Sequence, residues 1–418
     1  MTRLNDNFLK LRAGYLFPEI ARRVEAFSVA HPQLAPRIVR AGIGDVTEPL
    51  PAVAISALHR AVDDLGRRET FHGYGPPTGL LSVRQAIAEG DFRSRGIAVD
   101  DDEIFLSDGS KPDCSAVLEI LGCGNTVAVT DPVYPVYVDT NVMAGNTGAA
   151  RAEGGYEGIV AIPTSAATAF AAEPPEQRVD VVYLCSPNNP TGTVLSRAAL
   201  ERWVEWARRH ESIILFDAAY EAFIRDGSLP RSIFEIAGAR ECAMEFRSFS
   251  KNGGFTGLRC GYTVLPKSLQ ARAADGSRHA LHALWTRRWS TCSNGVSYPV
   301  QRAAESLYTA PGRAQTRQLI DFYLGNAALL LAACEGLGMR AFGGVNAPYV
   351  WVECPAGVSS WQAFDALLTQ GQLVVTPGAG FGRCGEGYFR ISAFNSRANA
   401  EEAGRRLAVL TAATAATR

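Results

Sequence analysis

One lysine in the middle of the chain stands in a setting that suits covalent chemistry. The primary amines of the chain belong to Lys10, Lys111, Lys251 and Lys267. Of these, Lys251 follows two hydroxyl residues in Ser248-Phe249-Ser250 and precedes a glycine pair and Arg259. A lysine among small residues at an apolar strand end can have a lowered pKa and attack a carbonyl carbon, and hydroxyls with an arginine suit a phosphate. The alternative is a surface lysine in a loop.

Polar residues also follow two predicted strands earlier in the chain. Residues 185–192 form a tight turn that contains Asn189, directly after a strand at 179–184. Asp217 and Tyr220 follow a strand at 213–216. Open α/β sheets bind ligands at the carboxyl ends of their strands. Taken alone, the first segment is equally well explained as a plain turn and Asp217 as the N-cap of a helix.

A third segment could bind an anion. Ser107-Asp108-Gly109-Ser110-Lys111 comes after a short apolar run at 103–106 and opens a stretch with helical spacing. Such a turn directs free backbone N–H groups toward an anion. Gly-Ser turns are common at helix starts, so this signal is weak by itself.

The elements that must position these residues alternate between strand and helix. Apolar, β-branched runs at 126–129, 179–184 and 213–216 predict parallel strands covered on both faces, and residues 200–209 predict a helix. This order predicts an α/β fold with right-handed crossovers. Strands at 349–353 and 387–392 with a helix at 360–370 predict a smaller α+β domain, joined through a long helical stretch at 298–336.

The expected domain boundary lies near residue 295. We expect an N-terminal arm and part of the small domain at 1–50, a large ligand-binding domain at 51–295, and the rest of the small domain with the linking helix at 296–418. A chain of 418 residues is long enough for two or three domains.

Composition excludes several classes of protein. The net charge of −1 gives no basic excess for binding nucleic acid. No uninterrupted apolar run reaches the roughly 18 residues of a membrane span, and the N-terminus does not resemble a secretory signal. The nine cysteines are scattered without a Cys-x-x-Cys pair, which favours reduced thiols in the cytoplasm. The histidines show no metal-binding spacing, so we expect no metal site.

The spacing of these residues makes the set specific. Asn189 and Asp217 are 28 residues apart, Tyr220 follows Asp217 by 3, and Arg259 follows Lys251 by 8. With these spacings the chain resembles the fold-type I enzymes that use pyridoxal 5′-phosphate (PLP), the aspartate aminotransferase superfamily, and within it the LL-diaminopimelate aminotransferases. Further segments that carry the resemblance lie at 7–11, 15–17, 42–47, 130–137, 250–264 and 344–349. Together they span nearly the whole chain.

The resemblance implies a complete set of cofactor residues. Lys251 would bind PLP covalently and, once released, move a proton. Asp217 would pair with the protonated pyridine nitrogen, Tyr220 and Asn189 would hydrogen-bond the ring oxygen, and Tyr134 would stack on the ring. The phosphate would be held by Gly109, Ser110, Lys111, Ser248, Ser250 and Arg259. Asn294 would lie near both cofactor and substrate.

The resemblance also implies how substrate and partner are bound. Arg390 would hold the substrate α-carboxylate through a bidentate pair, and Tyr15 and Gly42 would close over the substrate. Lys111, Tyr134, Asn189 and Asn294 would also contact it. Tyr74 would reach the phosphate of a neighbouring subunit, so we expect a homodimer with shared active sites.

The sequence departs from this family at the distal end of the substrate. The diaminopimelate enzymes usually have Gly-Tyr-Gly-x-Glu-Gln-Gly around the tyrosine, whereas this chain has Pro77 and Thr78 at the Glu and Gln positions. The family glutamate helps to hold the distal ammonium of diaminopimelate, and a proline cannot accept an ammonium. Two other segments also differ, namely Asn252-Gly253-Gly254 and Pro112.

These differences leave three functions open. The first is an aminotransferase for diaminopimelate or a related amino acid, with a changed substrate slightly favoured. The second is β- or γ-elimination, replacement or carbon–carbon bond formation in specialised biosynthesis, with S-adenosylmethionine as one candidate substrate. The third, a non-enzymatic regulator on this fold, is disfavoured because Lys251, Asp217 and Arg390 are all present.

Overall fold

The central element is a sheet of seven strands. The computed structural model describes residues 1–11, 16–151 and 155–415. The sheet has the order β2-β8-β7-β6-β5-β3-β4. Its strands are β2 (Ile104–Ser107), β3 (Val127–Asp131), β4 (Ile159–Pro163), β5 (Val181–Cys185), β6 (Ile213–Asp217), β7 (Ala243–Ser248) and β8 (Gly261–Val264). Only β8 runs antiparallel to its neighbours. The predicted α/β fold with a mostly parallel sheet is confirmed.

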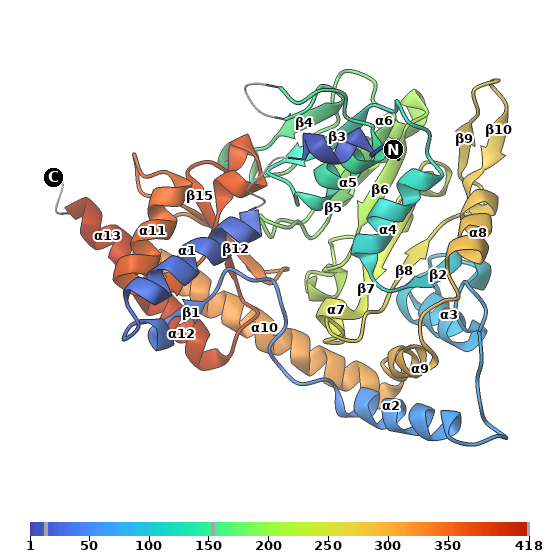
Figure 1. Cartoon of the computed structure of the whole chain (residues 1–418), viewed down its shortest axis with the longest axis horizontal. Coiled ribbons are helices and arrows are strands. Elements are labelled where there is room, and N and C mark those ends of the chain that lie inside the picture. The colour runs from blue at the N-terminus through green and yellow to red at the C-terminus, as the bar shows by residue number, and fades with distance from the viewer. Residues whose placement is uncertain (12–15, 152–154, 416–418) are drawn as a thin grey trace.

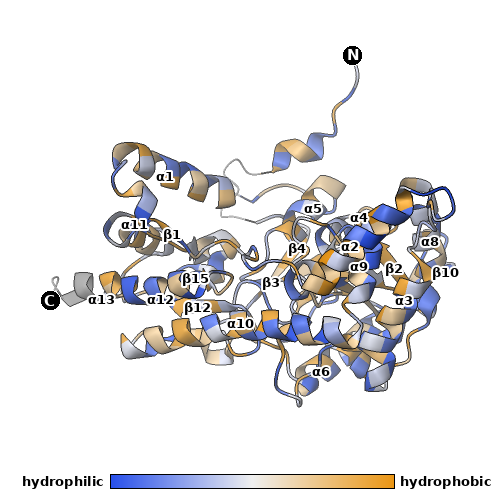
Figure 2. Cartoon of the chain, turned by 90° about the horizontal axis from the view of Figure 1, so that it is seen from below, coloured by the Kyte–Doolittle hydropathy of each residue, from blue (hydrophilic) through white to orange (hydrophobic). Residues whose placement is uncertain are grey.

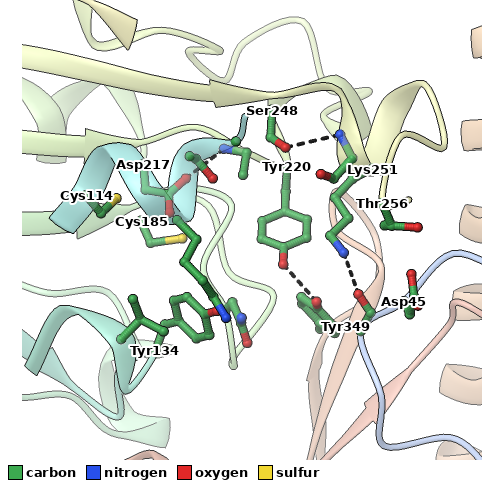
Figure 3. A pocket seen from close by; sticks show the side chains of 18 of the residues that line it. Asp45, Cys114, Tyr134, Cys185, Asp217, Tyr220, Ser248, Lys251, Thr256 and Tyr349 are labelled. Carbon is green, nitrogen blue, oxygen red and sulfur yellow. Dashed lines mark hydrogen bonds between the residues drawn. The ribbon is translucent and has the colours of Figure 1, made fainter. Parts of the chain in front are cut away.

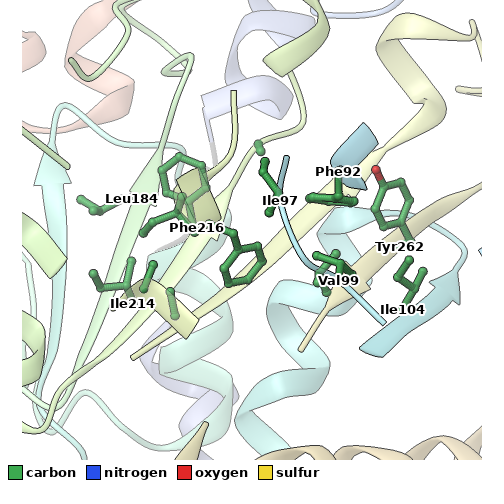
Figure 4. Packing of buried hydrophobic residues seen from close by; sticks show 14 of the residues in the cluster. Phe92, Ile97, Val99, Ile104, Leu184, Ile214, Phe216 and Tyr262 are labelled. Atoms are coloured by element: carbon green, nitrogen blue, oxygen red, sulfur yellow. The ribbon is translucent and has the colours of Figure 1, made fainter. Parts of the chain in front are cut away.

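Helices cover both faces of this sheet, which explains why its strands are continuous apolar runs. Helices α3 (Leu81–Ile87), α6 (Arg197–His210) and α9 (Tyr298–Ser306) pack on one face. On the other face pack α4 (Ser110–Ala116), α5 (Val136–Ala144) and α8 (Leu281–Cys292). Within β6, Ile214 and Phe216 enter the first core while Ile213 and Leu215 enter the second. Figure 4 shows the first core, where Phe92, Ile97 and Val99 pack near Phe216 and Tyr262.

The smaller domain is built on a four-stranded antiparallel sheet. Its order is β11-β12-β15-β14, with β11 (Ala341–Gly343), β12 (Tyr349–Glu353), β14 (Thr376–Pro377) and β15 (Tyr388–Ser392). Helices α1 (Leu16–Ala30), α11 (Ser360–Gly371) and α12 (Arg397–Arg406) contribute to its core. β1 (Val39–Arg40) pairs with β13 (Leu373–Val374), which ties the N-terminal segment to this domain. Figure 1 shows the two domains side by side, with α10 running diagonally from the small domain to beneath the large one.

The predicted helix at 298–336 is wrong as a single element. The chain forms two helices, α9 and α10 (Ala310–Gly336), because Thr309 caps the second helix and Pro311 lies in its first turn. α9 packs in the core of the main sheet. The boundary near residue 295 stays a prediction.

α10 joins the two domains. By length and composition alone α10 could cross a membrane. However, its Leu319, Ile320 and Tyr323 are buried beside β12, and its Ala327 and Leu330 are buried in the core of the small domain. These contacts make α10 a core helix. Figure 2 shows that hydrophilic and hydrophobic residues alternate along it.

Candidate active site

A cavity of about 480 Å³ lies at the carboxyl ends of the parallel strands. The large domain supplies most of its lining, and β12 and β15 of the small domain supply Tyr349 and Arg390. The predicted residues that line the cavity are Gly109, Ser110, Lys111, Tyr134, Asn189, Asp217, Tyr220, Ser248, Ser250, Lys251, Arg259 and Arg390. The fold therefore brings together residues that are up to 281 positions apart in the sequence (Gly109 to Arg390).

Lys251 reaches into this cavity from a short helix at the end of β7. The Ser248 hydroxyl accepts a hydrogen bond from the Ser250 N–H at 3.1 Å and so caps α7 (Phe249–Asn252). The Lys251 amine donates a short hydrogen bond to the carbonyl oxygen of Gly44 (Figure 3). Burial lowers the pKa of Lys251 to about 8, while the Asp45 carboxylate acts in the opposite direction. Lys251 is therefore an amine that can lose its proton near neutral pH.

Asp217 is the buried carboxylate at the end of β6. It accepts a hydrogen bond from the Tyr137 hydroxyl at 2.6 Å and another from the Ala219 N–H at 3.0 Å. Burial raises the pKa of Asp217, and these two hydrogen bonds oppose the shift. The Tyr137 ring stacks on Tyr183 with centroids 4.8 Å apart, which fixes the hydroxyl in place. A protonated ring nitrogen would give this buried carboxylate the cation that it lacks.

Hydroxyls and a guanidinium also line the cavity, beside the turn that contains Gly109. Gly109 has a φ of +135°, and a Cβ there would lie 2.7 Å from Nη2 of Arg259. Only glycine lets the turn before α4 come this close to the guanidinium. Ser110, Ser248 and Ser250 line the same cavity. This cradle suits a phosphate, and together with a buried amine and a buried carboxylate it fits PLP.

Arg390 forms the small-domain wall. Its side chain is 2% exposed, Nη2 donates to the carbonyl oxygen of Gly42 at 2.8 Å, and Nη1 donates to the Asn189 side chain. The guanidinium lies 4.4 Å from the centroid of the Tyr349 ring. Its Nε is buried and has no hydrogen-bond partner among the described residues. A carboxylate in the cavity would give this donor a partner.

Four predicted site residues that the structure describes, Gly42, Tyr74, Pro77 and Asn294, do not line the cavity within one chain. Tyr74 is 91% exposed, Asn294 is exposed and Pro77 is half-buried. A Cβ on Gly295 would lie 3.0 Å from the carbonyl oxygen of Pro76, so these two loops lie against each other. We call residues 71–78 with 294–295 the exposed strip. Tyr15 lies outside the described residues, and Gly42 contributes its carbonyl oxygen to Arg390.

Sequence reasoning missed two tyrosines and one backbone carbonyl of the site. Tyr137 holds Asp217, and the Tyr349 hydroxyl lies 2.8 Å from that of Tyr220. Gly44 accepts from Lys251, and a Cβ there would lie 2.4 Å from the Tyr349 hydroxyl. All three belong to segments that carry the family resemblance, and that resemblance is the sequence signal by which they could have been found. No cluster of three or more metal-ligating side chains occurs in the part of the chain that the structure describes.

Comparisons with known proteins agree with this geometry. Residues 37–407 match the family model for aminotransferase class I and II. The L,L-diaminopimelate aminotransferase of Chlamydomonas reinhardtii is 43% identical, with a TM-score of 0.90 over 97% of this chain and 98% of that one. Two more distant structures share the fold. The aspartate aminotransferase of Thermus thermophilus with maleate is 23% identical, with a TM-score of 0.78 over 98% of this chain and 100% of that one. The aromatic aminotransferase of Pyrococcus horikoshii OT3 is 24% identical, with a TM-score of 0.77 over 91% and 97%.

The match to the family model extends over most of the chain, and so does the 43% identical relative. The residues that line the cavity include an amine, a carboxylate, hydroxyls and a guanidinium, and this set fits PLP. The chain therefore belongs to the class I and II aminotransferases and is a PLP-dependent enzyme.

Proposed function

We propose that this enzyme transaminates an α-amino acid whose distal end is not a second amino acid head group. The observation that carries the proposal is the buried Arg390, which lines the same cavity as Lys251 and keeps an unpartnered Nε. A buried guanidinium without a carboxylate is costly unless a ligand supplies the anion. An α-carboxylate at Arg390 would direct the amino group and Cα of the substrate toward Lys251.

The reaction divides between the cofactor and the chain. Bound PLP supplies a carbonyl carbon for the substrate amine and a ring system that withdraws electrons from Cα. Lys251, with its lowered pKa, would accept the proton of Cα and hold it for return to the substrate–cofactor pair. Asp217, whose carboxylate is fixed by Tyr137, would pair with the protonated ring nitrogen. Tyr220, paired with Tyr349, places its hydroxyl in the cavity.

The distal specificity rests on the exposed strip. In the diaminopimelate enzymes that the chain resembles, a glutamate at the position of Pro77 helps to hold the distal ammonium. Without an acceptor, that ammonium would lose water with no partner, which costs on the order of 2–5 kcal/mol. This corresponds to a loss of roughly 30-fold to several thousandfold in kcat/KM. We therefore propose that the substrate is bulkier or differently charged at its distal end than diaminopimelate.

A homodimer is part of the same proposal. Phe71 and Tyr74 are 64% and 91% exposed, which is unusual for aromatic side chains in a folded monomer. His72, between them, stacks on Tyr298 of α9 with ring centroids 3.9 Å apart, so this strip is held in position. A second copy would cover these rings and bring Tyr74 to the partner's cavity. Nine free cysteines support a cytoplasmic location as a further proposal.

The test is a kinetic comparison with the holoenzyme. Diaminopimelate, methionine, S-adenosylmethionine, glutamate and aromatic amino acids are each supplied with 2-oxoglutarate, and the keto acid and glutamate products are measured. We expect a keto acid from a substrate other than diaminopimelate. Diaminopimelate as clearly the best substrate would make the chain an ordinary member of that group. Turnover of the amino acid without formation of glutamate from 2-oxoglutarate would instead indicate elimination, replacement or carbon–carbon bond formation.

A further inference from the structure

A second cavity lies behind the segments that carry Tyr220 and Lys251. It has a volume of about 180 Å³ and is walled by Glu221 and Ala222 on one side and by Phe249 and Asn252 on the other. Glu221 directly follows Tyr220, and Asn252 directly follows Lys251. Residues of the 90–95 segment, Leu307 and Tyr308 also line it, together with α10, which contacts α7 and lies below it in Figure 1. We call this the arginine cavity.

Its lining is strongly cationic. The guanidinium groups belong to Arg95, Arg225, Arg231, Arg313 and Arg317. The carboxylates that line the cavity belong to Asp91 and Glu221 alone. Five guanidinium groups face a small space with two carboxylates, and such an arrangement concentrates positive potential.

The two carboxylates are already engaged. Glu221 lies 2.7 Å from Arg231 and 3.0 Å from Arg247, which is buried behind the cavity. Asp91 accepts hydrogen bonds from the hydroxyls of Tyr262 and Tyr308. Burial raises the pKa of Asp91, so less of its charge is available to offset the arginines. Neither carboxylate is free to neutralise the mouth of the cavity.

Two arginines at the mouth have no anionic partner. Arg313 and Arg317 lie one turn apart on α10, both are exposed, and neither forms an ion pair with any described residue. By contrast, Arg225 pairs with Asp321 and Arg95 lies 3.5 Å from Glu235. Arg313 donates its Nε to the carbonyl oxygen of Tyr308 at 3.1 Å, which leaves its charge without an anion. Between the two arginines in the sequence stands Thr316, whose buried hydroxyl has no hydrogen-bond partner among the described residues. The side-chain oxygen of Asn252 is also buried without a partner.

We propose that the arginine cavity binds a phosphate group, as free phosphate or as a small phosphate monoester, and that this site is separate from the cofactor site. Guanidinium groups and a hydroxyl donor match the oxygens of a phosphate, and a cavity of about 180 Å³ is too small to enclose a whole nucleotide. Because the bound anion would contact the segments that carry Tyr220 and Lys251, it would act as an effector of the catalytic site. Nothing in this site depends on which amino acid the enzyme uses.

The direct test is calorimetric titration of the holoenzyme, freed of excess cofactor, with inorganic phosphate at constant ionic strength in chloride. We expect millimolar or tighter binding that weakens by at least about tenfold in Arg313→Ala/Arg317→Ala, since each lost guanidinium removes a charge-assisted hydrogen bond. Arg37→Ala/Arg40→Ala is the matched control, because it removes two exposed arginines of the small domain that have no ion-pair partner among the described residues. This control should bind phosphate as the wild type does.

Two further variants keep the proposal open to refutation. Thr316→Val retains the shape of the side chain and should weaken phosphate binding by about threefold. Arg390→Ala should leave it unchanged, because Arg390 lies in the other cavity. Binding that is lost with Arg390, or that is equal in the Arg313/Arg317 variant and the wild type, would overturn the proposal. Glycerol 3-phosphate separates the two sources: tighter binding than phosphate assigns a monoester, weaker binding assigns the free anion, and binding of neither refutes the site.

Discussion

The cofactor half of the site and the exposed strip are built in different ways. The cofactor half is formed by strand ends and short turns of one chain, and its polar groups are buried and mutually hydrogen-bonded, as with Asp217 and Tyr137. The exposed strip consists of two loops that touch each other but leave Tyr74 in solvent. The polar groups of the first region are therefore assembled within a single chain, whereas the second would reach a cavity only in the proposed dimer. The departures from the diaminopimelate enzymes at Pro77 and Thr78 fall in the second region, where a change disturbs no core packing.

Removing the amine of Lys251 should have the largest effect. In Lys251→Ala we expect activity to fall by roughly 10⁴-fold or more, because the amine that we propose binds the cofactor covalently and moves the proton is gone. Borohydride reduction and peptide mapping of the wild type should place the pyridoxyl label on Lys251. A label on Lys111, Lys10 or Lys267 would refute the assignment.

Arg390→Ala should lower kcat/KM by roughly 30-fold to several thousandfold, since truncating one partner of a buried charge pair costs about 2–5 kcal/mol. Cofactor binding should persist. Arg390→Lys keeps the charge without the bidentate geometry, so its kcat/KM should lie between those of the wild type and Arg390→Ala. The control is Arg340→Ala, whose guanidinium is exposed and 3.9 Å from Glu353. An unchanged kcat/KM in Arg390→Ala would mean that the carboxylate is held elsewhere.

Without the cofactor, Lys251 should lower the stability of the folded protein, because burial disfavours its charged amine. The pKa of Lys251 is lowered from 10.5 to about 8 in the folded chain. The unfolded chain therefore binds more protons between about pH 8 and 10.5, and the stability of the wild type should rise through that window. Lys251→Met should stabilise the cofactor-free protein by ~3 kcal/mol at pH 7, and the gain should vanish near pH 10.5.

Urea unfolding across this pH range measures the difference. Lys267→Met is the matched control, because Lys267 is exposed and its pKa is raised by hydrogen bonds to Asp102 and Asp100. No stabilisation is expected there. An equal increase in the free energy of unfolding in both variants would show that burial of the Lys251 amine does not destabilise the folded protein.

Restoring the family residues in the exposed strip should give a smaller, positive effect. Pro77→Glu/Thr78→Gln should raise kcat/KM for diaminopimelate by about tenfold or more, because the distal ammonium regains an acceptor. Pro76→Glu adds the same charge one position away and serves as the control. If the double variant gains nothing, or gains no more than the control, the distal pocket is not set by these two positions.

The smallest effect should come from the residue that positions Asp217. Tyr137→Phe removes one hydrogen bond and should weaken cofactor affinity by about fivefold, in line with ~1 kcal/mol for a hydrogen bond. Tyr183→Phe is the control, since its hydroxyl contacts Asn141 and Cys114 rather than Asp217. Fluorescence titration with PLP gives both affinities. Equal losses in the two variants would indicate a general packing defect.

The sequence predicted the strand ends better than the contacts between them. The run Ile213–Phe216 is apolar on both faces, so both the strand and its polar end at Asp217 could be predicted. The hydrogen bond from Tyr137 joins positions 80 residues apart, and no periodicity encodes it. The break between α9 and α10 was missed although Thr309 and Pro311 signal a helix start, because helical spacing continues across them. The cavity residues on loops could be assigned only through the family resemblance.

α10 has a mechanical consequence for substrate binding. At 1.5 Å per residue, its 27 residues form a rod about 40 Å long that is embedded in the packing of both domains. A rotation of about 5° at its N-terminal end would sweep the far end through roughly 3 Å. The small domain rides on that end and carries Arg390. A small tilt of α10 would therefore move Arg390 toward or away from a bound carboxylate while leaving the packing within each domain unchanged.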